Sequence, residues 1–218
     1  MDLTLHELGE RLFTSVLSDC LDAVGLRHQA LASRIRPLDE AAVMVGRART
    51  AAFMEVYHVD PGQNSYELEI KLIDSLRPGD IPVFACGNPL RIAPWGELLS
   101  TAARARGAVG AVMDGCTRDI KAIRAMGFPV FHGGIAPLDS QGRGRVMAID
   151  IPIECAGVAV SSGDLVFGDA DGVVVIPRAA EEEVLRLALA KVAGERSTLR
   201  DLQAGQSLAE VFARYGVL

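Results

Sequence analysis

The stretch from residue 97 to residue 131 limits the possible folds of this chain more than any other. Glu97 to Arg106 is rich in alanine and predicts a helix, which Gly107 can end in the left-handed conformation that glycine adopts easily. An apolar strand is expected over 108–113, a second helix over 119–126 and another strand around 129–131. Helices and strands that alternate across short connections pack as parallel βαβ units. The chain is therefore expected to be an α/β protein.

Shorter signals surround this stretch. Thr4 and Glu7 form a capping box, and apolar residues recur at helical spacing up to Asp22, so one helix is expected to open the chain. Asp114-Gly115 is expected to turn the chain, and Thr117 to cap the helix that follows. Further strands are predicted over 41–45, 51–56, 81–86, 145–153, 157–160, 165–167 and 173–176. Further helices are predicted over 67–76, from about 179 with a weak point at Gly194, and after a second capping box at Ser207 and Glu210.

The residues from Asp169 to Gly172 are typical of a hairpin turn, because aspartate and glycine both tolerate positive φ. A hairpin there adds antiparallel strands to the parallel ones in the middle of the chain. We therefore expect a mixed, partly parallel sheet flanked by helices.

Composition favours one soluble domain. Of the 218 residues, 50% are hydrophobic and 23% are charged, and a single core of this size buries about 70% of the surface of the unfolded chain. The formal net charge of −6 provides no basic surface for nucleic acid. The four cysteines form no CxxC pair, and the chain shows no secretory signal and no apolar run long enough for a bilayer. We expect a single domain over residues 1–218, with reduced thiols, in the cytoplasm and without nucleic-acid or membrane partners.

Several common catalytic motifs are absent from the sequence. No GxxxxGK[ST] loop, HExxH helix or GxSxG turn occurs, so phosphate-loop proteins, zincins and α/β-hydrolases have no local support. The four histidines are scattered without the spacing of metal ligands. The lysines are few, Lys71, Lys121 and Lys191, and none lies within an apolar strand, which disfavours imine chemistry.

Two helix N-termini indicate a binding site. One begins at Gly96-Glu97-Leu98-Leu99 and the other at Thr117-Arg118-Asp119, and parallel packing would bring both to one edge of the sheet. Their unpaired amides and positive dipoles can hold a substrate carboxylate. Glu97 and Asp119 are also explained by the preference of acids for the first turn of a helix. Arg118 is not, because a cation gains nothing from that dipole, and its pairing with Asp119 suggests a site for a metal-chelated oxyacid.

Four segments of the chain carry a family resemblance, and they read PWGELLSTAA at 94–103, GAVGAVMDGCTRD at 107–119, GDLVFGDADGVVVIPR at 163–178 and SDCLD at 18–22. Together they resemble the family of 4-hydroxy-4-methyl-2-oxoglutarate aldolases and regulators of ribonuclease E activity. The resemblance covers nearly the whole chain. It implies a swivelling β/β/α fold and a homotrimer or hexamer, with the C-terminal helices from about residue 179 at the subunit interface.

The resemblance also implies the roles of the site residues. The substrate-contacting residues of the family match four consecutive positions, Gly96, Glu97, Leu98 and Leu99. The arginine that binds the oxo-acid end matches Arg118, and the aspartate that binds a divalent metal, Mg²⁺ or Mn²⁺, matches Asp119. A glutamate reaches the site from a neighbouring subunit in the family, and Glu195 is its best-placed match.

The resemblance distinguishes an enzyme from a regulator at two positions. Aldolases of the family carry an acid, twenty residues and then Arg-Asp, as Glu97, residues 98–117 and Arg118-Asp119 do here. Members that only regulate ribonuclease tend to have glycine in place of Glu97 and an acid where this chain has Ala122. The sequence therefore predicts a metal-dependent aldolase that cleaves a 4-hydroxy-2-oxo acid to pyruvate and a second oxo acid. Such an enzyme is also suited to decarboxylate oxaloacetate, because both reactions leave a pyruvate enolate.

The expected mechanism follows from these roles. Asp119 would hold the metal partly through waters, and Arg118 would stabilise the charge that develops on the C2 oxygen. The amides of Leu98-Leu99 would fix the carboxylate. Glu97, together with Glu195 of the next subunit, is the candidate to position a water for proton transfer.

Two other functions compete with this prediction. A protein-binding regulator of an RNA-processing enzyme, without catalysis, is consistent with the acidic net charge, and Glu97 argues against it. A quinone methyltransferase has less support, because the sequence lacks a glycine-rich nucleotide loop.

Overall fold

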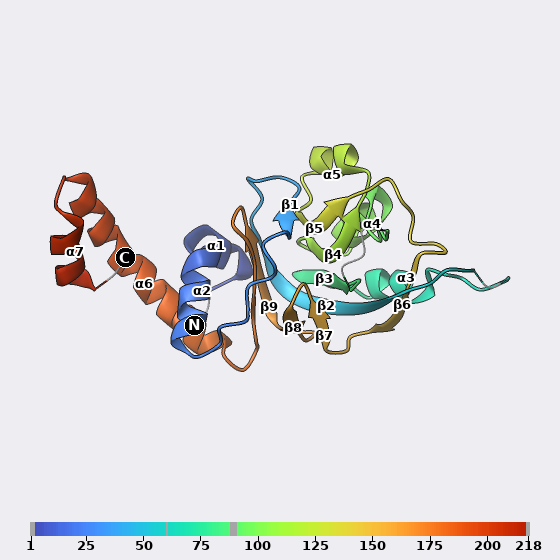
Figure 1. Cartoon of the computed structure of the whole chain (residues 1–218), viewed down its shortest axis with the longest axis horizontal. Helices are drawn as coiled ribbons and strands as arrows, with labels where there is room; N and C mark the ends of the chain where they lie inside the picture. Colours follow the sequence, from blue (N-terminus) through green and yellow to red (C-terminus); the bar gives the residue numbers. More distant parts are fainter. Residues whose placement is uncertain (1–2, 60, 88–90, 217–218) are drawn as a thin grey trace.

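A mixed sheet of eight strands lies at the centre of the protein (Figure 1). This computed structural model describes residues 3–59, 61–87 and 91–216. The strands are β1 (Arg36–Pro37), β2 (Met44–Glu55), β3 (Asp80–Ala85), β4 (Ala111–Thr117), β5 (Val130–Ile135), β6 (Gly144–Ile149), β7 (Ile153–Cys155), β8 (Val158–Val160), β9 (Leu165–Asp169) and β10 (Gly172–Ile176). The helices are α1 (Leu5–Arg11), α2 (Thr14–Ala23), α3 (Glu67–Asp74), α4 (Glu97–Ala105), α5 (Ile120–Met126), α6 (Glu181–Gln203) and α7 (Leu208–Tyr215).

The sheet is parallel in its middle and antiparallel at its ends. Its order is β1-β5-β4-β3-β2-β9-β10, with β6 paired to the second half of β2, while β7 and β8 form a separate hairpin. The pairs β2–β3, β3–β4 and β4–β5 are parallel, with α3, α4 and α5 between them along the chain. The β9–β10 hairpin places Asp169 opposite Gly172, as predicted. The predicted α/β class with a mixed, partly parallel sheet is confirmed.

The sheet nearly closes on itself. The Leu31 amide donates to the Val173 carbonyl of β10, and a few residues later Arg36 of β1 pairs with His132 of β5. The two ends of the sheet are therefore joined through one short segment of chain.

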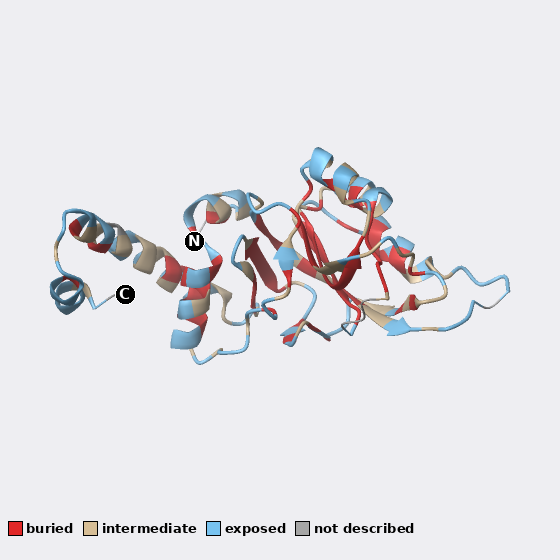
Figure 2. Ribbon diagram, turned by 45° about the horizontal axis from the view of Figure 1, so that its top comes forward, coloured by how far each residue is buried: buried red, intermediate tan, exposed pale blue. Residues whose placement is uncertain are grey.

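Side chains alternate between the two faces of the sheet, and each face packs against different elements. On β3, Ile81 points to an interior that includes the β7–β8 hairpin, whereas Phe84 points to the opposite face. That opposite face is covered by α3, α4 and α5, which contribute Leu72, Ala103 and Ile123. A third cluster packs α1, α2 and α6 against β9 and β10. Figure 2 shows the buried strands between these helices.

Two strands differ from the sequence prediction. β2 is one strand of 12 residues, where two were predicted over 41–45 and 51–56, because residues 47–50 pair with β3. The strand predicted over 145–153 is divided into β6 and β7. Asp150 lies between them with a left-handed φ of 55°, which a strand does not allow.

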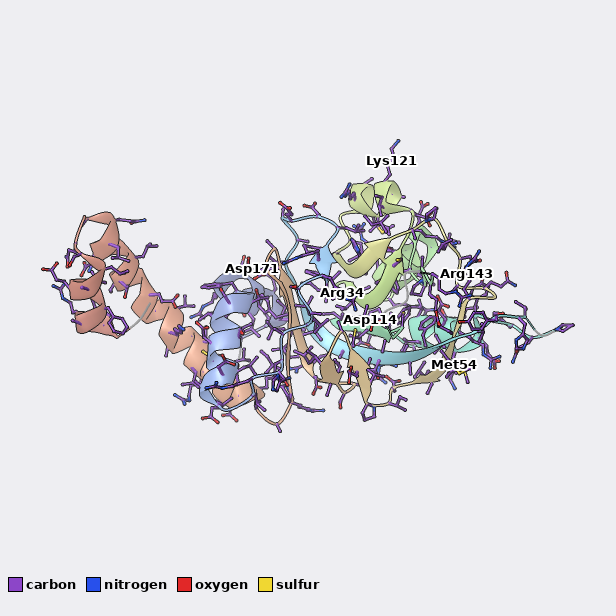
Figure 3. All side chains as sticks on the ribbon, in the orientation of Figure 1. Arg34, Met54, Asp114, Lys121, Arg143 and Asp171 are labelled. Atoms are coloured by element: carbon purple, nitrogen blue, oxygen red, sulfur yellow. The ribbon has the colours of Figure 1, made fainter. Side chains whose placement is uncertain are left out.

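The predicted turn at Asp114-Gly115 is wrong, because β4 runs through it to Thr117. The Asp114 carboxylate is buried and accepts hydrogen bonds from the amides of Cys86 and Ala156. Its carbonyl accepts a hydrogen bond from Arg34 (3.0 Å, Figure 3). These partners satisfy inside the fold an acid that would otherwise favour an exposed turn. Thr117 consequently ends a strand and does not cap a helix.

The single opening helix predicted over 4–22 is also wrong. The predicted capping box starts α1, but this helix ends at Arg11, and two extended residues precede α2. The Asp169 carboxylate accepts hydrogen bonds from the Thr14 amide (2.8 Å) and the Thr14 hydroxyl (2.6 Å). The β9–β10 turn thus caps a helix 155 residues away, which no local pattern encodes.

The helix α6 extends beyond the sheet (Figure 1). Its first part packs on α2 through buried residues such as Val184, whereas its later part and α7 stand away from the strands. Gly194 lies inside α6, with no atom within 4 Å of the position that a Cβ would take. The predicted capping box begins α7, and Tyr215 donates to the buried Asp201 carboxylate (2.9 Å).

None of the described helices is long and apolar enough to cross a membrane. The four cysteines are free thiols, and all four are buried. Burial raises the pKa of the Cys86 and Cys155 thiols well above the usual value, so these groups stay protonated at neutral pH.

Asp169→Ala is expected to lower the free energy of unfolding by about 1–3 kcal/mol, because it removes the acceptor of the Thr14 amide and hydroxyl at the start of α2. Asp171→Ala, an exposed position in the same turn, is the matched control and should change this free energy by less than about 0.5 kcal/mol. Urea unfolding followed by circular dichroism measures both variants. Equal stability of the two would show that the distant cap contributes nothing.

Candidate active site

The carbonyl group of Trp95 joins the two segments that were predicted to form the site. It accepts hydrogen bonds from the Arg118 amide (2.9 Å) and the Thr117 hydroxyl (3.1 Å). The Trp95 indole is fully buried, and its Nε1 donates to Ser100 Oγ (2.8 Å) in α4. Ser100 in turn donates to the Gly96 carbonyl (2.9 Å). The start of α4 is therefore fixed on the end of β4.

Asp119 lies across the N-terminus of α4. Its Oδ2 accepts a hydrogen bond from the Glu97 amide (3.1 Å), one of the amides that the helix itself leaves unpaired. Gly96 permits this approach, because a Cβ there would lie 2.5 Å from Asp119 Oδ2 and 3.1 Å from Arg118 Cγ. Asp119 is also the N-cap of α5 and has a left-handed φ of 56°, which is uncommon outside glycine. The N-termini of α4 and α5 thus meet at one carboxylate.

The Arg118 guanidinium lies between two carboxylates. Its Nε is 3.7 Å from Asp119 Oδ2, and its Nη1 is 3.7 Å from Asp139 Oδ1. Nη1 also donates to the Leu138 carbonyl (3.2 Å). Both carboxylates are beyond hydrogen-bonding distance, so they attract the arginine without forming a bidentate pair with it. A guanidinium held in this way can still donate to an anion that enters beside it.

A cavity of about 310 Å³ opens beside Arg118. One wall is formed by predicted site residues, Gly96, Leu98, Leu99, Arg118 and Asp119, with Pro94 beside them. The opposite wall comes from the α3 region and from the chain after β5, through Tyr66, Glu69, Ile70, Asp139 and Ser140. We call this space the inner cavity.

The far wall of the inner cavity carries two acids and a tyrosine, and the pKa values of all three side chains differ from their usual values. Glu69 is 4% exposed, and burial, together with the charge of Asp139, raises its pKa to about 8. Burial and a hydrogen bond to Asp139 (2.7 Å) raise the pKa of Tyr66 to about 12. Burial acts to raise the pKa of Asp139 as well, but the Tyr66 hydrogen bond and the Arg118 charge outweigh it and lower this pKa. At pH 7 the wall therefore holds a charged Asp139 beside neutral Glu69 and Tyr66.

Glu97 faces a second space, which we call the outer cavity. It measures about 860 Å³ and is lined by Glu97, Arg118 and Asp119 together with α5 and residues 135–137. Glu97 is exposed there. Arg118 and Asp119 consequently separate two cavities, with Glu97 on one side and Glu69 on the other.

Glu195 lies away from both cavities within the same chain. It belongs to α6, which leaves the sheet at the opposite end from α4 and α5 (Figure 1). Its neighbours are Lys191 and Asp19, which form an ion pair of 2.5 Å. Burial acts to lower the pKa of Lys191, but Asp19 and Glu195 outweigh it and raise this pKa. A second copy of the chain is needed to bring a Glu195 to Arg118.

The acidic wall was not predicted from the sequence. Glu69 did leave a signal, because the buried face of α3 carries Glu69, Leu72 and Ile73 at i, i+3 and i+4. An acid therefore occupies a position where the helical period calls for an apolar residue. Asp139 left no such signal, since only the folding of β5 and the chain after it brings this residue to Arg118.

The donor set at Asp119 fits a hard divalent cation. Across the described residues, no group of three or more His, Cys, Asp or Glu side chains is arranged to hold a metal ion. The Asp119 side chain is 44% exposed and lines both cavities, and one hydrogen bond from Glu97 leaves further carboxylate lone pairs. Mg²⁺ often binds through one or two carboxylates and keeps several waters. One exposed carboxylate at the junction of two cavities suits this way of binding.

Known proteins share this chain's sequence and fold. A family model described as "RraA-like: Aldolase/RraA" matches residues 14–175. A protein of Halalkalibacterium halodurans named "Putative 4-hydroxy-4-methyl-2-oxoglutarate aldolase" is 38% identical over 187 residues, which cover 86% of this chain and 83% of that protein. An uncharacterized protein from Pseudomonas syringae has a crystal structure with a TM-score of 0.82 and 27% identity, covering 95% of each chain.

Streptomyces coelicolor RraAS2, described as an unusual member of the RNase ES inhibitor RraA protein family, has a similar crystal structure. Its TM-score is 0.79 at 27% identity, and the match covers 89% of this chain and 94% of that one. These structures confirm the predicted fold class.

The stability of Glu69→Gln relative to the wild type is expected to rise with pH. A carboxyl with a pKa of about 8 in the folded protein and 4.5 otherwise binds more protons when folded, so the wild type loses stability between about pH 5 and pH 8. Glutamine does not titrate, so the difference should grow by a few kcal/mol over this range. Urea unfolding at four pH values measures it. Glu67→Gln, exposed on the same helix, is the control, and a flat difference for Glu69→Gln would contradict the burial argument.

Proposed function

Because this chain belongs to the RraA-like family of aldolases and RraA proteins, we propose that it is a divalent-metal-dependent lyase of 2-oxo acids. The reaction is cleavage of a 4-hydroxy-2-oxo acid, of the 4-hydroxy-4-methyl-2-oxoglutarate type, to pyruvate and a second oxo acid. The observation that carries this proposal is the Arg118–Asp119 pair, which lies at the N-terminus of α4 beside the inner cavity. Oxaloacetate decarboxylation is a second proposed activity, because it passes through the same enolate.

Each residue of the pair has a distinct role in this reaction. Asp119 holds the cation, Mg²⁺ or Mn²⁺, and such a cation supplies Lewis-acid polarisation of the C2 carbonyl when bound. Arg118 donates hydrogen bonds to the C2 oxygen as negative charge develops on it. The amides of Leu98 and Leu99, at the positive end of the α4 dipole, bind the C1 carboxylate.

The C4 hydroxyl loses its proton on the outer side of the pair. Glu97 lines the outer cavity and positions a water that accepts this proton, with Glu195 of a neighbouring subunit beside it. The assignment of Glu195 requires a second copy of the chain, and we propose a trimer or hexamer with the helices after residue 179 at the interface. Exposed apolar side chains on α6 and α7, Leu199, Leu208 and Phe212, support that placement.

Lysine-based catalysis has less support. No lysine lines the inner cavity within the described ranges. Lys191 is paired with Asp19, and Lys71 is exposed on α3. Lys121 lies at the edge of the outer cavity, but its side chain extends outward from α5 (Figure 3). We also propose a cytoplasmic location for this lyase, which the free thiols support. The proposed substrate is a small molecule, and the net charge of −6 supports the proposal that nucleic acid is not a partner. We propose no membrane partner.

A second candidate function is a protein-binding regulator of a ribonuclease. The similarity to RraAS2 favours it, since that protein is described as a member of an RNase inhibitor family. A pull-down with the arginine-rich region of such a ribonuclease, beside a pyruvate-release assay coupled to lactate dehydrogenase, separates the two. Pyruvate release without capture supports the lyase, and capture without pyruvate release supports the regulator.

Arg118→Ala and Asp119→Ala are each expected to lower kcat/KM for 4-hydroxy-4-methyl-2-oxoglutarate by at least about 100-fold, because each removes charge stabilisation at the C2 oxygen. The coupled pyruvate assay measures this loss, and circular dichroism checks that the variants remain folded. Arg106→Ala, which removes an exposed ion pair with Asp74, is the matched control and should keep wild-type rates. Normal rates with either site variant would contradict the mechanism.

Treatment with EDTA is expected to abolish pyruvate release, and added Mg²⁺ or Mn²⁺ should restore it, because Asp119 alone cannot polarise the carbonyl. The control is the thermal unfolding temperature in EDTA, which separates loss of cation from loss of fold. Full activity in chelator would favour a lysine-based route.

A further inference from the structure

Glu69 is a buried acid in the wall of the inner cavity, and no hydrogen bond joins its carboxyl to any residue that the structure describes. It is 4% exposed and lines this cavity with Gly96 and Leu99. The influences on its carboxyl are burial and the charges of Asp139 and Arg118, and no described residue donates a hydrogen bond to it. Among the described residues, the fully enclosed side-chain atoms without a hydrogen-bond partner do not include the Glu69 oxygens, so its carboxyl touches the space of the inner cavity. A buried acid that meets only a cavity is placed to act on what enters it.

The helix α3 directs this acid into the cavity. Leu72 and Ile73, three and four residues later, are almost fully buried against the sheet, so Glu69 shares their face. Glu67 lies on the same helix and is exposed to solvent. The two glutamates of α3 therefore have opposite surroundings, and of the acids of this helix only Glu69 lines the inner cavity.

The groups around Glu69 determine its charge. Asp139 opposes its ionisation and Arg118 favours it, while the Tyr66 hydroxyl at the start of α3 is bound to Asp139. Burial is the largest influence and raises the pKa of Glu69 to about 8. At pH 7 this side chain therefore carries a proton beside the arginine that is proposed to bind the C2 oxygen.

We infer that Glu69 is a catalytic residue that delivers a proton to C3 of the pyruvate enolate and, in the reverse direction, removes one from it. The inference rests on the proposed function, in which Arg118 binds the C2 oxygen and thereby places the adjacent C3 in the inner cavity. The roles proposed for Arg118, Asp119 and Glu97 leave C3 without a proton donor.

The step balances in protons and electrons. As the C3–C4 bond breaks, its electron pair forms the enolate double bond, and the C4 hydroxyl loses its proton to a water and becomes a carbonyl. The O–H bond of Glu69 then breaks while a C3–H bond forms, and the C2 carbonyl is restored. The Glu69 carboxylate recovers a proton from solvent, so one proton has moved from the C4 hydroxyl to C3 overall.

Two other groups near Arg118 are less suited to this step. Glu97 is exposed and lines the outer cavity, on the far side of Arg118. The Tyr66 proton is held in a hydrogen bond to Asp139, and a pKa of about 12 makes this phenol a weak acid. Glu69 is thus the acid of the inner cavity that has a proton to transfer.

Glu69→Gln tests the inference through two reactions. The first is cleavage of 4-hydroxy-4-methyl-2-oxoglutarate, and the second is exchange of the pyruvate methyl hydrogens in D₂O, followed by proton NMR. Glutamine keeps the shape and can still donate a hydrogen bond, but it cannot transfer a proton. Both rates are expected to fall by at least about 100-fold, while the pyruvate concentration at half-maximal exchange changes by less than about threefold. The control Glu67→Gln should keep wild-type rates.

Wild-type rates in a folded Glu69→Gln variant would overturn the inference and leave the proposed function intact. A variant that only needs more pyruvate, at an unchanged maximal rate, would also overturn it, because that result assigns Glu69 to binding. A wild type that shows neither cleavage nor exchange with Mg²⁺ present would instead remove the proposed function itself.

The wild type provides a second test should the variant not fold. Cleavage uses the acid form of Glu69 and exchange uses its carboxylate, so cleavage should slow and exchange should accelerate as the pH rises through about 8. Parallel pH dependence of the two rates would overturn the inference.

Discussion

The hydrogen bonds accepted by the Trp95 carbonyl hold the whole site together. They join the start of α4 to the end of β4, and the buried indole fixes that carbonyl by packing against Phe84 and Phe128. Truncating an aromatic side chain in a core typically costs about 3–5 kcal/mol, several times the net contribution of about 1 kcal/mol from one hydrogen bond. The positions of Arg118 and Asp119 therefore depend on packing in the core more than on any contact at the surface.

The charge balance of the site gives the proposed cation a role beyond carbonyl chemistry. One arginine lies between two aspartates, Asp119 and Asp139, so one positive charge meets two negative charges, and burial keeps Glu69 from adding a third at pH 7. An anionic 2-oxo acid entering this net negative region would be repelled. A divalent cation held by Asp119 would reverse the sign of the local charge and would let the substrate carboxylate approach.

Local patterns predicted the elements that carry the site, whereas distant contacts decided how these elements meet. The Ala-rich helix and the left-handed Gly107 after it follow from backbone preferences, and the structure contains both. The continuation of β4 through Asp114 does not, because the amides that bind its carboxylate belong to other parts of the chain. The helical period of α3 places Glu69 among apolar residues, so this acid could be noticed in the sequence. A single acid in an apolar stripe nevertheless indicates no function until the cavity that it faces is known. Asp139 reaches Arg118 only in the folded chain.

The two cavities divide the proposed reaction into halves with different structural demands. The smaller inner cavity would hold the part of the substrate that becomes pyruvate, where Arg118 and Glu69 act on adjacent atoms. The wider outer cavity would receive the C4 substituents, and its size would allow oxo-acid products of more than one kind to leave. Glu97 lies on that outer side. The family resemblance implies that members that only regulate ribonuclease tend to have glycine at this position. Loss of this one acid would remove the group that is proposed to position the water that accepts the C4 proton. The hydrogen bonds of the Trp95 carbonyl and the core would stay unchanged. The same fold can therefore persist with or without the lyase reaction.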